Sequence, residues 1–171
     1  MTAAMNSASG PLLTSAMRAE FDRETAKYPA DQRQSAVIAC LAIVQRELGF
    51  VSVESEKQVA EYLGMPPIAV HEVTTFYNMF NQHPVGKYKF NVCTNLPCQL
   101  RDGQAALAHI CKKLDVAVGG TTADGQFTVQ QSECLGACAD SPVMLINDRE
   151  MISFMSNDRI DDLLATLAQA K

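Results

Sequence analysis

Apolar residues recur three or four positions apart through much of the first half of the chain, which is the spacing of amphipathic helices. The pattern is clearest where Val37, Leu41, Val44 and Leu48 line one face of a predicted helix that Gly49 would end. Proline and glycine residues mark further boundaries along the same half. We therefore predict four helices, over residues 15–27, 31–48, 55–64 and 67–76.

Local signals predict where these helices begin and end. The first stops before Pro29, because the residue that precedes a proline avoids the helical conformation. Ser55 and Gln58 have the spacing of a capping box at the start of the third helix, and Pro67 suits the first position of the fourth. The fourth helix leads into an aromatic segment, residues 76–80. We expect this segment to pack the helical half against the rest of the chain, and a partner-binding surface is the alternative.

A different pattern begins at Lys87, where apolar and polar residues alternate as in a half-buried strand. Strands are predicted at 88–92, 126–130, 142–146 and 151–154, with an optional weak strand near Val116. Helices are predicted from about Cys98 to Leu114 and from about residue 157 to 168. This order predicts an α+β protein, with an N-terminal helical bundle followed by a thioredoxin-like α/β domain that has a small mixed sheet.

The change of pattern also predicts the domain boundaries. Residues 1–14 are small and polar and are assigned to a flexible tail. We assign residues 15–83 to an N-terminal helical domain and residues 84–171 to the thioredoxin-like domain. The boundary falls in a turn-rich segment.

The composition is that of a globular protein with a core, with 47% apolar and 19% charged residues. A net charge of −5 gives no electrostatic reason to expect nucleic acid as a partner. The longest apolar run, residues 36–44, is too short to cross a bilayer, so no direct membrane insertion is expected. Because the first residues show no export or mitochondrial signal, the expected location is the bacterial cytoplasm.

Four of the six cysteines form two close pairs. Four residues separate Cys93 from Cys98, and three residues separate Cys134 from Cys138. Each pair follows a predicted strand, so a small α/β unit would bring the pairs face to face at one end of its sheet. The other two cysteines, at positions 40 and 111, lie in apolar stretches and are predicted to be core residues.

Four converging thiolates suit either an iron–sulfur cluster or a structural zinc ion. Zinc ligands usually come in pairs with a two-residue gap, whereas gaps of four and three residues can wrap a larger object. The spacing therefore favours a [2Fe–2S] cluster bound by Cys93, Cys98, Cys134 and Cys138. An all-cysteine cluster carries a charge of about −2 when oxidised, so a low reduction potential is expected, and a helix N-terminus at Cys98 would ease the cost of reduction. Gly136 is expected to let the backbone lie close to the cluster. Residues expected to supply N–H groups or packing are Thr94, Asn95, Leu96 and Ala137.

Other chemistries have less support in the sequence. Thiol–disulfide exchange usually needs two intervening residues between its cysteines. No nucleophile–histidine–carboxylate constellation and no glycine-rich phosphate loop is apparent. We expect His109 to be solvated, and His71 and Glu72 to be surface residues without consequence.

The segments around the cysteines resemble a known family. The motifs CTNLPC at 93–98, DGQFT at 124–128, ECLGAC at 133–138 and SPV at 141–143 are similar to those of the thioredoxin-like [2Fe–2S] subunit family of bacterial NADH:quinone oxidoreductase, which is respiratory complex I. The FYNMF segment at 76–80 fits the same family, and the resemblance covers about residues 15–168. It implies that the four paired cysteines ligate one [2Fe–2S] cluster.

The resemblance also implies a function and partners. Members of the family dock on a larger flavoprotein that binds NADH, FMN and a [4Fe–4S] cluster, and they exchange single electrons with the flavin. This chain is then expected to be an electron-transfer subunit of a multisubunit NADH dehydrogenase, beside other complex I subunits and peripheral to the inner face of the bacterial plasma membrane. No NADH or quinone site is expected in this chain alone. The alternatives are the same module in an NAD-reducing hydrogenase or an NAD-dependent formate dehydrogenase, a zinc-stabilised structural adaptor, and a free-standing ferredoxin.

Overall fold

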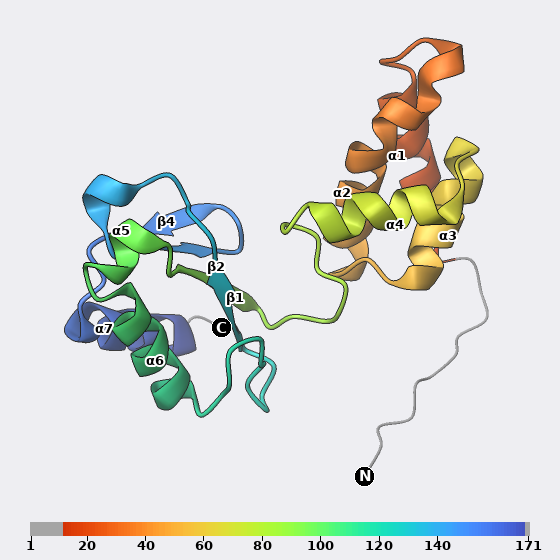
Figure 1. Ribbon diagram of the computed structural model, residues 1–171. Coiled ribbons are helices and arrows are strands. Elements are labelled where there is room, and N and C mark those ends of the chain that lie inside the picture. Colours follow the sequence, from red (N-terminus) through yellow and green to blue (C-terminus); the bar gives the residue numbers. More distant parts are fainter. Residues whose placement is uncertain (1–11, 170–171) are drawn as a thin grey trace. The chain divides into compact units, whose positions relative to one another are not determined.

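The computed structural model describes residues 12–169, which form two compact units (Figure 1). The boundary between the units falls between Pro84 and Val85. The first unit is helical, and the second combines a sheet with helices. None of the helices within residues 12–169 has the length and apolar character needed to cross a membrane.

The helical unit packs its amphipathic helices around one core. Its elements are α1 (Ser15–Thr25), the 3-10 helix η1 (Ala30–Ala36), α2 (Val37–Leu48), α3 (Val53–Leu63) and α4 (Pro67–Phe76). Each α-helix contributes apolar side chains to the same buried cluster, among them Phe21, Leu41, Val59 and Val70. Burying such a side chain contributes about 1.5–3 kcal/mol to folding, so this shared core holds the short helices together.

Two of the helices begin at other residues than predicted. The segment before Val37 forms η1, with a non-helical residue at Gln32, because its polar sequence has no apolar stripe to pack as an α-helix. Helix α3 begins earlier than predicted, with the Ser52 hydroxyl accepting a hydrogen bond from the Ser55 N–H. The predicted capping box at Ser55 and Gln58 is therefore wrong. The Gln58 side chain instead accepts a hydrogen bond from the Leu13 N–H at 3.1 Å.

That contact also corrects the predicted tail. Leu13 is buried in the helical core, and the Thr14 side chain caps α1 by accepting a hydrogen bond from the Met17 N–H. Both residues therefore belong to the helical unit. Residues 1–11 of the predicted tail lie outside the described residues.

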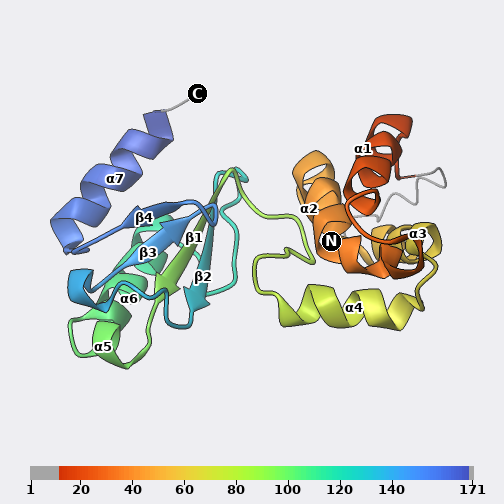
Figure 2. The same cartoon turned by 90° about the horizontal axis from the view of Figure 1, so that it is seen from above.

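The second unit is built on a four-stranded mixed sheet (Figure 2). Its elements are β1 (Tyr88–Cys93), α5 (Leu96–Gln99), α6 (Gly103–Leu114), β2 (Phe127–Ser132), the 3-10 helix η2 (Cys138–Asp140), β3 (Met144–Ile146), β4 (Glu150–Ile152) and α7 (Asn157–Gln169). The strand order is β2-β1-β3-β4, with β1 parallel to β2 and antiparallel to β3. The predicted fold class, a helical bundle followed by a thioredoxin-like α/β part with a small mixed sheet, is confirmed.

The core of this unit lies between one face of the sheet and helices α6 and α7. Register brings Phe90, Val129 and Ile146 side by side on that face. These side chains pack with Ile110 of α6 and Ile160 of α7 in one buried cluster. The strand that leads to Cys93 is therefore held from its neighbours on both sides and from the helices.

The helix predicted from Cys98 to Leu114 is two helices. Helix α5 has only four residues, and the chain then turns at Asp102, whose φ is 67°. Helix α6 begins at Gly103, where a Cβ atom would lie 2.8 Å from the Cys98 carbonyl oxygen and 2.9 Å from that of Cys93. The start of α6 is thus packed directly on the backbone of the first cysteine pair, and only glycine leaves room for it.

Two smaller predictions for this unit concern Val116 and His109. The optional strand near Val116 does not form, and a single bridge joins Thr121 to Thr128. His109 is only partly exposed, and its Nε2 lies 2.7 Å from an Asp161 carboxylate oxygen, a contact that joins α6 to α7.

Candidate functional site

Two parallel neighbouring strands bring the cysteine pairs to one edge of the sheet. The pairing of β1 with β2 places Cys93 opposite Ser132, so both strands end at the same level. Cys93 is the last residue of β1, and Cys134 follows β2 by two residues. Because parallel strands point the same way, the loops that follow them meet at one edge.

The first pair is buried. Cys93 and Cys98 are each 2% exposed and form a small cluster with Val143, against which Leu135 and Ala137 pack. Val143 reaches the pair through its carbonyl, which accepts a hydrogen bond from the Cys93 N–H at 3.1 Å. The protein therefore shields two of the four sulfur atoms from water.

The second pair is exposed. The sulfur atoms of Cys134 and Cys138 lie 4.0 Å apart in the loop that follows β2. Gly136, with φ at 77°, turns this loop so that its N–H points at the Cys134 sulfur at 3.4 Å. A residue with a side chain would be strained in this conformation.

Backbone N–H groups also surround the buried sulfur atoms. Asn95 and Leu135 donate backbone hydrogen bonds to Cys93, and Val143 donates one to Cys98. Of these donors, only Asn95 was predicted from the sequence. Leu135 and Val143 belong to loops that approach the first pair only after the sheet has formed, so spacing within the sequence could not reveal them.

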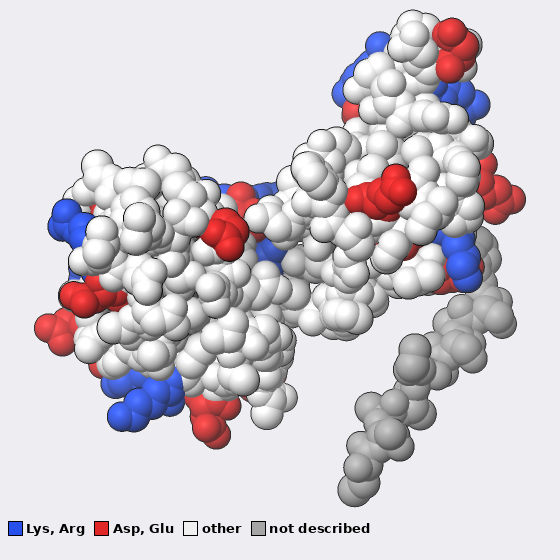
Figure 3. All heavy atoms as spheres, viewed as in Figure 1, with Lys and Arg blue, Asp and Glu red and all other residues white. Residues whose placement is uncertain are grey.

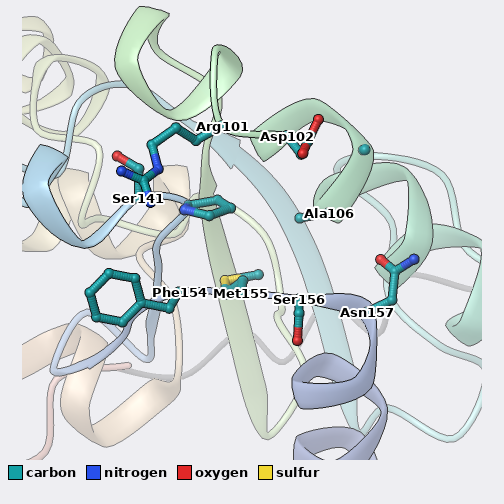
Figure 4. Close-up of a pocket in the computed structure, with 10 residues that line it drawn as sticks. Arg101, Asp102, Ala106, Ser141, Phe154, Met155, Ser156 and Asn157 are labelled. Carbon is teal, nitrogen blue, oxygen red and sulfur yellow. The ribbon is translucent and has the colours of Figure 1, made fainter.

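Ser141 is a further polar residue at the site. Its hydroxyl oxygen lies 3.5 Å from the Cys98 sulfur and donates a hydrogen bond to the Cys138 carbonyl oxygen at 2.5 Å. A cavity of about 510 Å³ lies beside it, lined also by Arg101 and Phe154, and Figure 4 shows the Arg101 side chain extending towards Ser141. The sequence identifies Ser141 only as part of the SPV motif at 141–143.

The pKa values of the thiols follow from burial and hydrogen bonding. Burial raises the pKa of Cys93, whereas the hydrogen bond with the Cys134 thiol raises that of Cys138. Burial also acts to raise the pKa of Cys98, but its hydrogen bonds with Ser141, Val143 and Cys93 outweigh burial and lower that pKa. Cys98 is thus the member of its pair that the protein favours as a thiolate.

The cause of that preference differs from the predicted one. Helix α5 is too short to provide the helix dipole that was predicted at Cys98. The hydrogen-bond partners of Cys98 are Ser141, Val143 and Cys93, and none of them lies at the N-terminus of a helix.

Two apolar side chains of the site are exposed. Leu96 and Leu100 are 64% and 77% exposed on the segment that carries Cys98. Figure 3 shows mostly uncharged surface over α5, with acidic side chains near the loop after β2. In that loop Glu133, next to Cys134, is exposed and accepts a hydrogen bond from the Asn95 side chain. Exposed apolar side chains such as these two leucines are typical of the centre of a protein–protein interface.

The donor set fits a [2Fe–2S] cluster. Within residues 12–169, no three His, Cys, Asp or Glu side chains are grouped to hold one metal ion. The cysteines lie instead as two pairs, which matches a cluster in which each iron takes two cysteine ligands. Amide donors directed at the sulfur atoms suit an anionic iron–sulfur group as well.

The remaining candidates lie away from the cysteine edge. Cys40 is fully buried in the helical core, where burial raises its pKa to about 12, and Cys111 packs against the core of the α/β unit. His71 is not without consequence, since its Nδ1 lies 3.0 Å from the buried carboxylate of Glu56, which also accepts a hydrogen bond from Thr74. These contacts join α3 to α4 and have a structural role.

Comparison with known proteins identifies relatives over most of the chain. A family model described as thioredoxin-like [2Fe-2S] ferredoxin matches residues 21–168. A subunit of the NADH-quinone oxidoreductase of Rhizobium meliloti is 36% identical over 155 residues, covering 91% of this chain and 90% of that protein. The mitochondrial NADH dehydrogenase [ubiquinone] flavoprotein 2 of Dictyostelium discoideum is 44% identical over 131 residues, 75% of this chain and 53% of that longer protein.

A solved structure has the same fold. An NAD+-reducing [NiFe]-hydrogenase in the air-oxidised state matches with a TM-score of 0.67 over 78% of this chain and 23% of the hydrogenase chain. The sequence identity is 22%, so this likeness concerns the fold alone.

Proposed function

Because the chain belongs to the thioredoxin-like [2Fe–2S] ferredoxin family, we propose that it is an electron-transfer subunit of a multisubunit NADH dehydrogenase. The family predicted from the sequence is thereby confirmed. The similarity to a subunit of NADH-quinone oxidoreductase over nine tenths of both chains supports this assembly rather than a hydrogenase or a formate dehydrogenase.

The proposed ligands are Cys93, Cys98, Cys134 and Cys138. The observation that carries this assignment is the meeting of two thiol pairs at one sheet edge, with backbone N–H groups directed at their sulfur atoms. When bound there, a [2Fe–2S] cluster accepts and returns one electron at a time.

The residues of the site divide it into an insulated side and an accessible side. Cys93 and Cys98 are buried beneath Val143, which keeps water from their sulfur atoms. Cys134 and Cys138 are exposed, and so are Leu96 and Leu100 on the segment that carries Cys98. Electrons would enter and leave on the exposed side, where a partner can approach closely.

The proposed partner is a larger flavoprotein subunit that binds NADH and FMN, next to other subunits of the complex. The exposed side chains of Leu96 and Leu100 suit a stable protein contact. Through these subunits the chain would lie peripheral to the inner face of the bacterial plasma membrane. NADH oxidation and quinone reduction would take place in other subunits.

The proposal is tested by reconstituting the full chain with iron and sulfide under anaerobic conditions. We expect two irons and two acid-labile sulfides per chain, together with a rhombic EPR signal after reduction. Cys134→Ser should lose that signal, whereas Cys111→Ser, which changes a thiol away from the site, should retain it.

The competing hypothesis is a zinc-stabilised structural adaptor. It predicts a colourless chain with one zinc ion and no sulfide, and that result would refute the proposed function. The four- and three-residue gaps within the two cysteine pairs, in place of the two-residue gap usual for zinc, favour the cluster.

A further inference from the structure

Ser141 touches both cysteine pairs. Its hydroxyl oxygen is 3.5 Å from the Cys98 sulfur, and it donates a hydrogen bond to the backbone carbonyl of Cys138. The residue is 1% exposed, so this hydroxyl is kept from water. We propose, on the basis of the proposed function, that Ser141 is a positioning residue whose hydroxyl donates a hydrogen bond to the Cys98 thiolate and makes the cluster easier to reduce.

The hydroxyl proton has two acceptors once Cys98 is a ligand. In the free chain the Cys98 thiol donates to the Ser141 oxygen, and the Ser141 hydroxyl donates to the Cys138 carbonyl. A cysteine that ligates iron is a thiolate, which can only accept hydrogen bonds. The Ser141 hydroxyl can then donate its hydrogen bond either to the Cys138 carbonyl oxygen or to the Cys98 sulfur.

The local hydrogen bonds favour the sulfur. The Cys138 carbonyl also accepts the backbone N–H of Ser141 at 3.3 Å, so it keeps a partner when the hydroxyl turns away. Hydrogen bonds to charged acceptors are roughly twice as strong as those between neutral groups. A buried thiolate with too few donors is also costly. Rotation about the Cβ–Oγ bond of Ser141 is enough to turn the hydroxyl proton from the Cys138 carbonyl oxygen to the Cys98 sulfur.

The hydrogen bond from Ser141 affects the reduction potential of the cluster because it stabilises the negative charge of the Cys98 thiolate. Val143 already donates a backbone N–H to Cys98, and Ser141 would add a second neutral donor from the same segment. Donors stabilise negative charge, and the reduced cluster carries one more negative charge than the oxidised cluster. The Ser141 hydrogen bond should therefore be stronger in the reduced state.

The test is an EPR-monitored redox titration of the full chain reconstituted with its cluster. Ser141→Ala should lower the ratio of reduced to oxidised cluster at a fixed potential about tenfold, which is about 59 mV for a one-electron couple. Ser141→Thr keeps the hydroxyl and should stay close to the wild-type potential. Ser153→Ala is the matched control, since the Ser153 hydroxyl donates to the Asp140 carboxylate and not to a sulfur atom.

A second measurement uses only the wild-type chain. A brief transfer into deuterated buffer labels a hydroxyl before hydrogen-bonded backbone amides exchange. Electron–nuclear double resonance of the reduced cluster should then detect a coupled deuteron. This readout tests the proposal even if Ser141→Ala binds no cluster.

Distinct results would overturn the inference. A role for the hydroxyl is refuted if Ser141→Ala leaves the reduction potential unchanged, or if Ser141→Thr lowers the reduction potential as much as Ser141→Ala does. It is also refuted if the wild-type chain shows no rapidly exchanging deuteron coupled to the cluster. If the wild-type chain binds iron and sulfide while these tests refute the role of Ser141, the proposed function stands and only this inference fails. A wild-type chain without a cluster overturns the proposed function, and this inference with it.

Discussion

Gly103→Ala is expected to damage the cysteine site without changing any candidate ligand. At the start of α6, the added Cβ would lie 2.8 Å from the Cys98 carbonyl oxygen and 2.9 Å from the Cys93 carbonyl oxygen. Both contacts are with backbone atoms, which cannot turn aside as a flexible side chain can. The loop between the first two cysteines would therefore have to shift.

The direction of the change in the free energy of unfolding shows whether the contacts of the added Cβ outweigh the higher helix propensity of alanine. Alanine is a better helix former than glycine by about 0.8–1 kcal/mol, so without the contacts Gly103→Ala would stabilise α6. Forcing extra atoms into a packed site costs about 1–3 kcal/mol, which offsets that gain. We expect a net loss of about 1 kcal/mol in the free energy of unfolding.

The assay compares Gly103→Ala with Gly119→Ala. Gly119 has φ at 83° and open space around the position of a Cβ, so its substitution strains the same unit without touching the cysteines. Urea unfolding followed by circular dichroism gives the stability of each variant, and visible absorption gives the cluster bound after reconstitution. Gly103→Ala should bind less cluster than Gly119→Ala at similar stability. A more stable Gly103→Ala with full cluster content would refute the predicted contact.

Two further predictions concern residues outside the cysteine edge. Hydrogen bonds from Lys113 and His109 lower the pKa of Asp161, so the stability from this carboxylate should be present at neutral pH and be lost as the pH falls through that lowered pKa. Melting temperatures of the wild-type chain and Asp161→Asn should therefore differ at pH 7 and converge in acid, and a constant difference would contradict this. Cys40, with its pKa raised to about 12 by burial, should resist alkylation at pH 8 in the folded chain, while Cys134 in the cluster-free chain reacts. Mass spectrometry of the digested chain measures both, and rapid labelling of Cys40 would show that the helical core opens.

Residues that specify structure through their neighbours in the sequence were predictable. The bounds of α4, Pro67–Phe76, followed from a proline suited to the first helical turn and from the apolar pattern after it. Gly49 was predicted as a helix end and has the left-handed conformation that ends α2. The strand that leads to Cys93 followed from strict alternation of apolar and polar residues, but the prediction that it is half-buried is wrong, because Lys89 and Asn91 are buried as well. Each of these signals lies within a few residues of the feature it specifies.

The sequence alone also determined which residues carry the candidate chemistry, because the paired cysteines and their spacing are local properties of the chain. Only the tertiary structure decided which sulfur atoms are buried and which groups surround them. Ser141 lies 43 positions from Cys98, and the two meet because β3 pairs with β1 and carries the segment before it to the cysteine edge. The interruption after α5 likewise depends on how closely Gly103 approaches the Cys93 and Cys98 backbone. Such contacts depend on the pairing of strands and the packing of helices, which local sequence patterns do not encode.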